Sequence, residues 1–254
     1  MKGTRSKQYD AFGFHPDAME EALRPARWLH QNYFRVRSYG AENIPRSGGV
    51  IAAANHSGAL PMDGVMLGVD LFENTDCKRY PRVIADHFVA RLPYVGVLFA
   101  RMGAVGGSRR NLEALLDSEQ LVVVFPEGTS GVGKPFSERY QLQRWHVGHA
   151  ELALRHRVPV LPVGIIGAEE QWPLLARIGG LHAFGAPYLP IPATPLPLPV
   201  RYHIHYGAPI NLAQEFGEAA AESPEHVQKA AERIRDAVQA LLTEGLAQRK
   251  GVFR

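Results

Sequence analysis

His56 and Asp63 are the side chains whose types and spacing best suit acid–base chemistry. His56 follows the apolar run 50–54, and the residues between it and Asp63 include glycine and proline, which favour a turn. Such a turn can return the carboxylate to the imidazole, where it orients the ring and stabilises its protonated form. The pattern therefore predicts a histidine base, assisted by an aspartate, at the end of a strand.

A second apolar run, residues 121–125, is followed by a carboxylate, a glycine and a hydroxyl group at Glu127, Gly128 and Thr129. Backbone amides of a glycine-rich turn at a strand end can bind an anion. The stretch that ends at Lys134 also fits G-x-x-x-x-G-K, the pattern of a phosphate-binding P-loop. Pro135 follows in place of the serine or threonine that binds magnesium, which argues against a nucleotide site.

Arg109 and Arg110 follow another glycine-rich turn and open a helical pattern. A guanidinium group can bind phosphate through two parallel hydrogen bonds. Arg109 is therefore a candidate for contact with an anionic substrate.

Short apolar runs alternate with helical patterns along most of the chain. Strands are predicted at 50–54, 82–85, 121–125 and 159–166, and helices near 64–72, 87–100, 109–119 and 138–156. This alternation predicts a single α/β domain with a mostly parallel central sheet flanked by helices. Residues 200–206 alternate apolar and polar, which predicts a half-exposed strand, and an amphipathic helix from Ser223 closes the chain.

The N-terminal segment, residues 1–40, is predicted to form an amphipathic helix from 16 to about 36, with a kink or break at Pro25. Its second half mixes aromatic side chains with arginines, as in helices that lie at lipid interfaces. The alternative is a helix that packs on the core and leaves its arginines in solvent.

No charged residue lies between Arg177 and Arg201, although six prolines interrupt that segment from Pro187 onward. Prolines at this density exclude a lipid-exposed helix, because each removes a backbone donor. We expect an extended apolar loop that either covers the core or dips into a membrane surface, most notably over 178–200.

The composition indicates which binding partners and which cellular compartment the protein is suited to. The net charge of +3 and the pI of about 9.0 suit anionic substrates or anionic lipid surfaces, and they are too weak to predict nucleic-acid binding. The single cysteine, Cys77, excludes an internal disulfide and predicts a reducing compartment. The residues after Met1 lack the apolar stretch of a secretory signal, so we do not expect secretion.

Taken together, the motifs resemble those of the glycerolipid acyltransferases, typified by bacterial 1-acylglycerol-3-phosphate acyltransferase. Asn55-His56 with Asp63 is similar to that family's N-H-x4-D motif, and its arginine motif ends near Arg109. Residues 125–130 resemble F-P-E-G-T-R-S, and residues 158–163 resemble V-P-I-x-P-V. The order and the approximate spacing of the four motifs agree from about 44 to 166.

The resemblance implies transfer of a fatty acyl group from acyl-CoA or an acyl carrier protein to the hydroxyl of a lysophospholipid or related glycerolipid. It implies an acyltransferase domain over 41–254, without metal or cofactor, bound peripherally or monotopically to the cytoplasmic face of a membrane. His56 and Asp63 would be catalytic. The residues implied in binding the acceptor or its phosphate are Arg109, Glu127, Gly128, Thr129 and Lys134.

Three departures from the family pattern bear on the acceptor. Six residues, 57–62, separate His56 from Asp63 where four are usual, and Ser130 and His146 stand where cations are common. Fewer cations favour less charged acceptors than a simple phosphomonoester, such as a lysophospholipid, diacylglycerol or another lipid alcohol. A serine hydrolase and a non-enzymatic lipid-binding protein are the alternatives from other classes, but no G-x-S-x-G motif is present.

Overall fold

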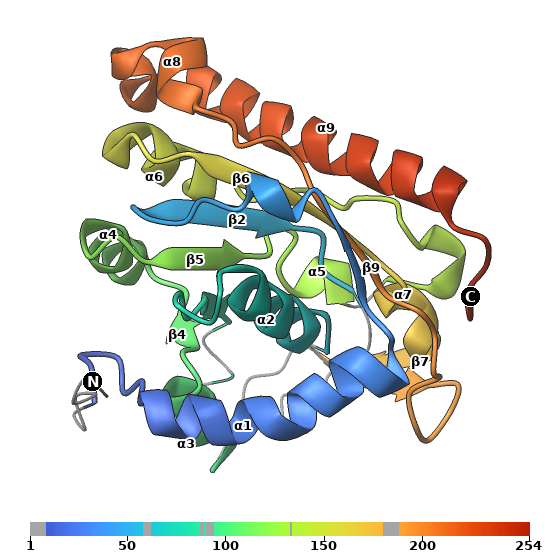
Figure 1. The fold of residues 1–254 in the computed structure, drawn as a ribbon. Helices are drawn as coiled ribbons and strands as arrows, with labels where there is room; N and C mark the ends of the chain where they lie inside the picture. The colour runs from blue at the N-terminus through green and yellow to red at the C-terminus, as the bar shows by residue number, and fades with distance from the viewer. Residues whose placement is uncertain (1–8, 58–61, 87–88, 90–93, 133, 180–187) are drawn as a thin grey trace.

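Seven strands form the central sheet of the computed structural model, in the order β1-β9-β6-β2-β5-β3-β4 (Figure 1). The structure describes residues 9–57, 62–86, 89, 94–132, 134–179 and 188–254. The sheet strands are β1 (Arg37–Tyr39), β2 (Val50–Ala54), β3 (Arg82–Ala85), β4 (Val105–Gly106), β5 (Leu121–Val124), β6 (Val160–Ile166) and β9 (His203–Tyr206). Neighbouring strands are parallel except β6 and β9, so the predicted single-domain α/β fold is confirmed.

Helices cover both faces of this sheet. The α-helices are α1 (Pro16–Trp28), α2 (Met62–Asn74), α3 (Val95–Arg101), α4 (Arg109–Asp117), α5 (Thr129–Val132), α6 (Gly148–His156), α7 (Ala168–Gln171), α8 (Leu212–Phe216) and α9 (Pro224–Gln248). Short 3-10 turns are η2 (Ala41–Asn43), η4 (Phe136–Glu138) and η6 (Glu218–Glu222). Helix α9 lies along one face and α2 along the other, with α1 outside α2 (Figure 1).

The central strand β2 shows why the apolar runs become buried strands. Ile51 and Ala53 belong to the core cluster formed with α4, α6 and α9, whereas Val50, Ala52 and Ala54 belong to the cluster that includes α2. Successive side chains of a strand point to opposite faces, so a strand covered on both sides must be apolar throughout. The run 50–54 meets this requirement.

The N-terminal helix packs on the body of the protein. Met19, Leu23 and Ala26 of α1 are buried in a cluster with Val69 and Phe72 of α2. Of the kink or break predicted at Pro25, the break does not occur, because the α-helix continues through Pro25 to Trp28. A π-helical turn, η1 (Leu29–Tyr33), follows it.

Part of the predicted helix 138–156 is instead irregular, because residues 139–147 form neither a helix nor a strand. Helix α6 begins only at Gly148, and the backbone amides of Tyr140 and Gln143 donate to buried carboxylates of Glu169 and Glu127. An amide bonded to a distant carboxylate is not available for a helical bond. The prediction failed because the partners of these amides lie far away in sequence.

The predicted half-exposed strand is in fact fully buried. All four residues of β9 are buried, because β9 lies between β1 and β6 and α9 packs against it. Its polar residues, His203 and His205, can enter the core because a neutral imidazole carries no charge. Burial first, and then the neighbouring His205 and nearby arginines, lower the pKa of His203 to about 4, so it is neutral at pH 7.

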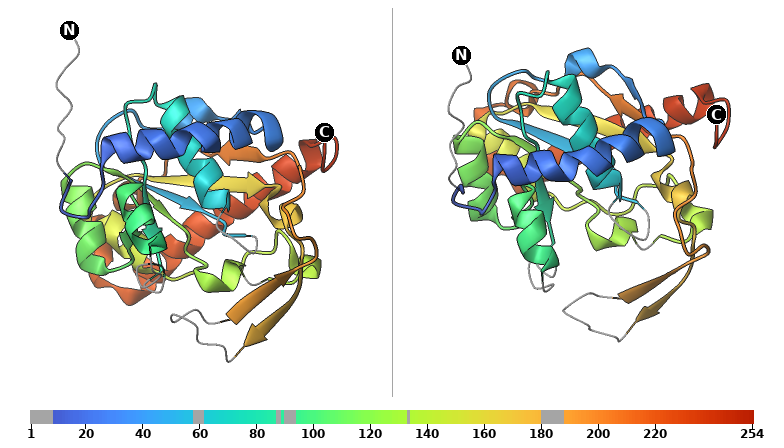
Figure 2. Two further views of the ribbon diagram at one scale, coloured as in Figure 1. Left: turned by 90° about the horizontal axis from the view of Figure 1, so that it is seen from below. Right: turned by 60° about the horizontal axis from the view of Figure 1, so that its bottom comes forward.

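The proline-rich segment contains a hairpin rather than a featureless loop. Strands β7 (Leu174–Gly179) and β8 (Tyr188–Pro192) form an antiparallel two-stranded sheet, and residues 180–187 between them lie outside the described part of the chain. Both strands of such a sheet are edge strands, which tolerate the missing donors of Pro190 and Pro192. Figure 2 shows β7 and β8 projecting away from the central sheet.

Candidate functional site

The two chemical motifs meet at the carboxyl edge of the sheet. Strands β2 and β5 are parallel neighbours with Ala53 opposite Val124, so the residues that follow them are brought side by side. Functional residues of open α/β sheets collect at this edge. Asn55 braces the end of β2, because its side chain donates to the carbonyl of Ile165 at 3.0 Å and accepts from the amide of Ile165 at 2.7 Å.

His56 and Asp63 form the predicted pair. His56 Nδ1 lies 2.7 Å from Asp63 Oδ2, and the exposed fraction of the side chain is 14% for His56 and 0% for Asp63. Asp63 lies in the first turn of α2, and it also accepts hydrogen bonds from the amides of Ser57 and Gly64, both at 2.8 Å. The longer interval between the two residues therefore still permits direct contact.

This geometry selects one tautomer of the neutral imidazole. A carboxylate only accepts hydrogen bonds, so Nδ1 of His56 carries the proton that it donates to Asp63. Neutral His56 then presents a lone pair at Nε2, and within the described residues no hydrogen bond occupies that nitrogen. The pair can accept a proton at Nε2 while Asp63 stabilises the resulting charge.

Glu127 positions His56 instead of facing solvent. Its Oε1 accepts from the backbone amide of His56 at 3.0 Å, and its Oε2 accepts from the amide of Gln143 at 2.8 Å. The Phe125 ring stacks on the imidazole with centroids 4.3 Å apart. A methyl group at Gly131 would lie 2.9 Å from His56 Cβ, so only glycine allows α5 to approach this closely.

Lys134 is enclosed with two carboxylates. Its Nζ lies 3.4 Å from Glu127 Oε2 and 3.1 Å from Glu169 Oε1, and all three side chains are buried, since their exposed fractions are 3%, 0% and 6%. Burial raises the pKa of Glu169 to about 7, although Lys134 and the amide of Tyr140 oppose this shift. The role predicted for Lys134 was acceptor binding, but its ammonium group is already engaged by these carboxylates.

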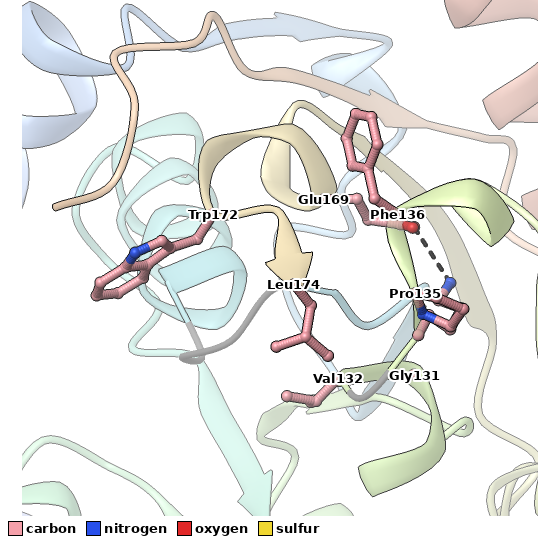
Figure 3. A pocket seen from close by; sticks show the side chains of 8 residues that line it. Gly131, Val132, Pro135, Phe136, Glu169, Trp172 and Leu174 are labelled. Carbon is pink, nitrogen blue, oxygen red and sulfur yellow. Dashed lines mark hydrogen bonds and ion pairs between the residues drawn. The ribbon is translucent and has the colours of Figure 1, made fainter. Parts of the chain in front are cut away.

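A small pocket lies beside this cluster. Gly131, Phe136, Glu169 and Leu174 are among the residues that line it (Figure 3), and its volume of about 10 Å³ is the space of one water molecule. It is too small to hold an acyl chain.

Arg109 has a different environment from that predicted. Its guanidinium donates to Glu151 at 2.8 and 3.1 Å and to Glu113 at 3.0 Å, and these bonds raise its pKa further above the usual range. A substrate phosphate would have to compete with both carboxylates. Six of the predicted site residues therefore lie near one another: His56, Asp63, Glu127, Gly128, Thr129 and Lys134, with Thr129 at the start of α5. Arg109 differs, because Glu113 and Glu151 neutralise its charge.

Several residues that position His56 and Glu127 were not predicted from the sequence. Glu169, the amide of Gln143 and the close approach of Gly131 depend on contacts between distant segments. Phe125 had a sequence signal, because it ends the apolar run that precedes Glu127.

Neither a metal cluster nor a membrane-spanning helix is evident in the described ranges. No three histidine, cysteine, aspartate or glutamate side chains there are placed to hold a metal ion. None of the helices in those ranges is long and apolar enough to cross a bilayer.

Comparisons with known proteins agree with the motifs. The family model Acyltransferase matches residues 35–166. An uncharacterized protein of Mycobacterium tuberculosis is 37% identical over 96% of this chain and 71% of its own length. The human protein named DGAT1/2-independent enzyme synthesizing storage lipids is 28% identical over 80% of this chain and 60% of its own length.

The fold also has a solved counterpart. The crystal structure of the 1-acyl-sn-glycerophosphate acyltransferase PlsC from Thermotoga maritima matches with a TM-score of 0.59 and 20% identity. The match covers 92% of this chain and 80% of that one.

Proposed function

We propose that this chain, which belongs to the Acyltransferase family, moves a fatty acyl group from an acyl thioester to the hydroxyl group of a glycerolipid. The observation that carries this proposal is the His56–Asp63 contact of 2.7 Å, which leaves Nε2 of a partly exposed imidazole available as a base. The thioester would be acyl-CoA or an acyl carrier protein, and no metal or cofactor takes part in the proposed steps.

The reaction needs a base because a lipid hydroxyl is a weak nucleophile. Nε2 of His56 removes the hydroxyl proton while the oxygen attacks the thioester carbonyl, and Asp63 stabilises the imidazolium. Nearby backbone amides would stabilise the oxyanion, but the amide of Gly128 is not one of them, because it already donates to the carbonyl of Phe125 at 2.9 Å. When the carbon–sulfur bond breaks, the imidazolium returns the proton to the thiolate, which gives an ester and a free thiol.

The acceptor has two candidate classes. Lysophospholipids, including lysophosphatidic acid, follow from the motifs and would place the protein in phospholipid synthesis. A neutral acceptor such as diacylglycerol, or another lipid alcohol, is favoured by Ser130 in the usual place of arginine and by the carboxylates that neutralise Arg109. The name of the human relative, an enzyme synthesizing storage lipids, supports the second class.

An assay of acceptor-dependent thiol release tests the proposal. The purified protein is given acyl-CoA or acylated carrier protein with a panel of lysophospholipids, diacylglycerol and simple lipid alcohols. We expect thiol release that requires an acceptor and yields the acylated lipid. Release without any acceptor would instead indicate a thioester hydrolase, and binding without release would indicate a lipid-binding protein.

The Asp63→Asn variant should retain the fold and lose at least about tenfold in turnover, because an amide cannot stabilise an imidazolium as a carboxylate does. The Ser57 and Gly64 amides donate to different oxygens of Asp63, and the single oxygen of asparagine can keep one of these bonds, so we expect a modest loss of stability without unfolding. Initial rates with saturating substrates measure the effect. Unchanged turnover would mean that another group performs the role assigned to Asp63.

The Arg109→Ala variant distinguishes the acceptor classes. If Arg109 leaves Glu113 and Glu151 to bind a substrate phosphate, its loss should raise KM about tenfold or more for phosphate-bearing acceptors and little for diacylglycerol, since a charge-assisted bond is worth about 1.5–3 kcal/mol. Measured KM values for the two acceptors provide the test. An equal change for both would assign Arg109 a structural role.

We also propose that the protein works at the surface of a membrane, as a peripheral or monotopic protein on the cytoplasmic face. Exposing acyl chains to water costs about 0.8 kcal/mol per methylene, so an enzyme that binds its lipid substrate at the bilayer surface avoids this cost. Exposed apolar side chains that could contact such chains are Tyr94, Val97 and Leu98 around α3 and Leu175 and Ile178 on β7. Both elements project on the same side in Figure 2.

A further inference from the structure

Within the described chain, three arginines without a carboxylate partner gather where β1 begins and where the chain enters β9. Arg37 is the first residue of β1, Arg35 precedes it, and Arg201 lies just before β9. Over the ranges that the structure describes, no ion pair joins any of the three to an acidic group. Some arginines elsewhere, such as Arg82, Arg155 and Arg249, are paired with a carboxylate, whereas Arg79 donates to backbone carbonyls.

The positive charge of this cluster is uncompensated among the described residues. The pKa of Arg201 is lowered, first because the group is partly removed from water and then because Arg37 and Arg35 are nearby. Its Nε is buried and has no hydrogen-bond partner within the described chain. A bound anion would supply the missing negative charge, which the outward-facing nitrogens of the guanidinium groups can contact.

Arg35 is held firmly in this cluster. Its backbone has φ of 45°, in the left-handed region that non-glycine residues seldom adopt. Its Nη2 donates to the carbonyl of Pro199 at 2.7 Å and to that of Phe253 at 3.4 Å. Hydrogen bonds of Arg35 therefore join the segment before β1 to the segment before β9 and to the C-terminal residues.

Exposed apolar side chains lie at the margin of the cluster. Trp28 is 57% exposed, Leu196 is 72% exposed and Phe253 is 55% exposed. Tyr33 stacks on Trp28 with centroids 6.4 Å apart, and its hydroxyl donates to the carbonyl of Pro197 at 2.6 Å. These contacts join the aromatic end of the N-terminal helix to the proline-rich segment, the two regions whose sequences suggested lipid contact.

The cluster lies at the same edge of the sheet as His56. Strand β9 is antiparallel to β6, and its first residue, His203, pairs with Ile166, the last residue of β6. Strand β6 is in turn parallel to β2, which leads to His56. The end of α1, the start of β9 and the chain's C-terminus share one side of the molecule in Figure 1.

We infer that Arg35, Arg37 and Arg201, with Trp28, Leu196 and Phe253 around them, form a surface that docks on an anionic bilayer and binds the phosphate of a lipid headgroup. This inference rests on the proposed lipid substrate and names the surface by which the protein reaches it. Arginines beside exposed aromatic groups suit the boundary between headgroups and acyl chains. Binding should weaken with salt, because the attraction to anionic lipid is screened.

Vesicle co-sedimentation tests the inference with the full chain. Vesicles of phosphatidylcholine alone are compared with vesicles that also contain phosphatidylglycerol, each at low and high salt. The variant with Arg37→Gln and Arg201→Gln should bind the anionic vesicles about 30-fold more weakly, about fivefold for each arginine near the surface. The matched control carries Lys229→Gln and Arg233→Gln on α9, which removes the same charge elsewhere and should bind like the unaltered protein.

The remaining outcomes decide against the inference. An equal loss in the control variant would show only a net-charge effect, and unchanged binding of the Arg37 and Arg201 variant would place membrane contact elsewhere. Binding of inorganic phosphate by the unaltered protein, without preference for anionic vesicles, would assign the cluster to a soluble phosphate compound.

Short-chain, water-soluble substrates separate this inference from the proposed function. Acyl transfer to them without vesicle binding would reject the docking surface and leave the enzyme proposal intact. Vesicle binding that depends on the arginines, without acyl transfer to any acceptor, would support docking and reject the enzyme proposal.

Discussion

Replacing His56 with alanine should lower acyl transfer by about 10² to 10⁴-fold, the range expected for a general base. The variant loses the only proton acceptor proposed for the lipid hydroxyl. Its fold should persist, because Glu127 bonds to the backbone amide of residue 56 and not to the imidazole. Turnover under saturating substrate, with circular dichroism to verify folding, measures the result.

A matched histidine variant provides the control. His226 is an exposed residue in the first turn of α9, and its replacement by alanine should leave turnover unchanged. If folded His56→Ala protein retained near-normal turnover, the proposed base mechanism would be wrong.

The Lys134→Met variant should lose about 3–5 kcal/mol of unfolding free energy, the usual cost of removing one partner from a buried ion pair. Glu127 and Glu169 would then lie close together in the interior without their shared cation. Chemical denaturation measures the change. Lys229, paired on the surface with Glu225, offers a control whose replacement by methionine should cost less than about 1 kcal/mol.

A second substitution tests the reason for that loss. Adding Glu169→Gln to Lys134→Met removes one of the two acidic groups left without their cation and should recover part of the stability. The two changes could instead be additive, so that Glu169→Gln lowers the unfolding free energy equally with and without Lys134. In that case the ion pair would not explain the stability lost in Lys134→Met. Acyl transfer should also fall in Lys134→Met, because Glu127 fixes the position of His56.

The sequence by itself determined the fold class and the centre of the site. Apolar runs such as 50–54 and 121–125 suit strands buried on both faces, and parallel strands place their carboxyl ends together. For that reason the order of the motifs along the chain is enough to predict that His56 meets Asp63 and that both lie beside the turn at Glu127.

The tertiary structure alone decided which charges remain free. Lys134 pairs with Glu169 across 35 positions of sequence, and Arg109 pairs with Glu151 across 42, so neither cation is simply available to a substrate. A different long-range contact, from the amide of Gln143 to Glu127, keeps the segment before α6 non-helical, and the position of β9 between β1 and β6 buries two histidines. Local patterns specify strands and helices, whereas the partner of a charge or an amide depends on segments that only folding brings together.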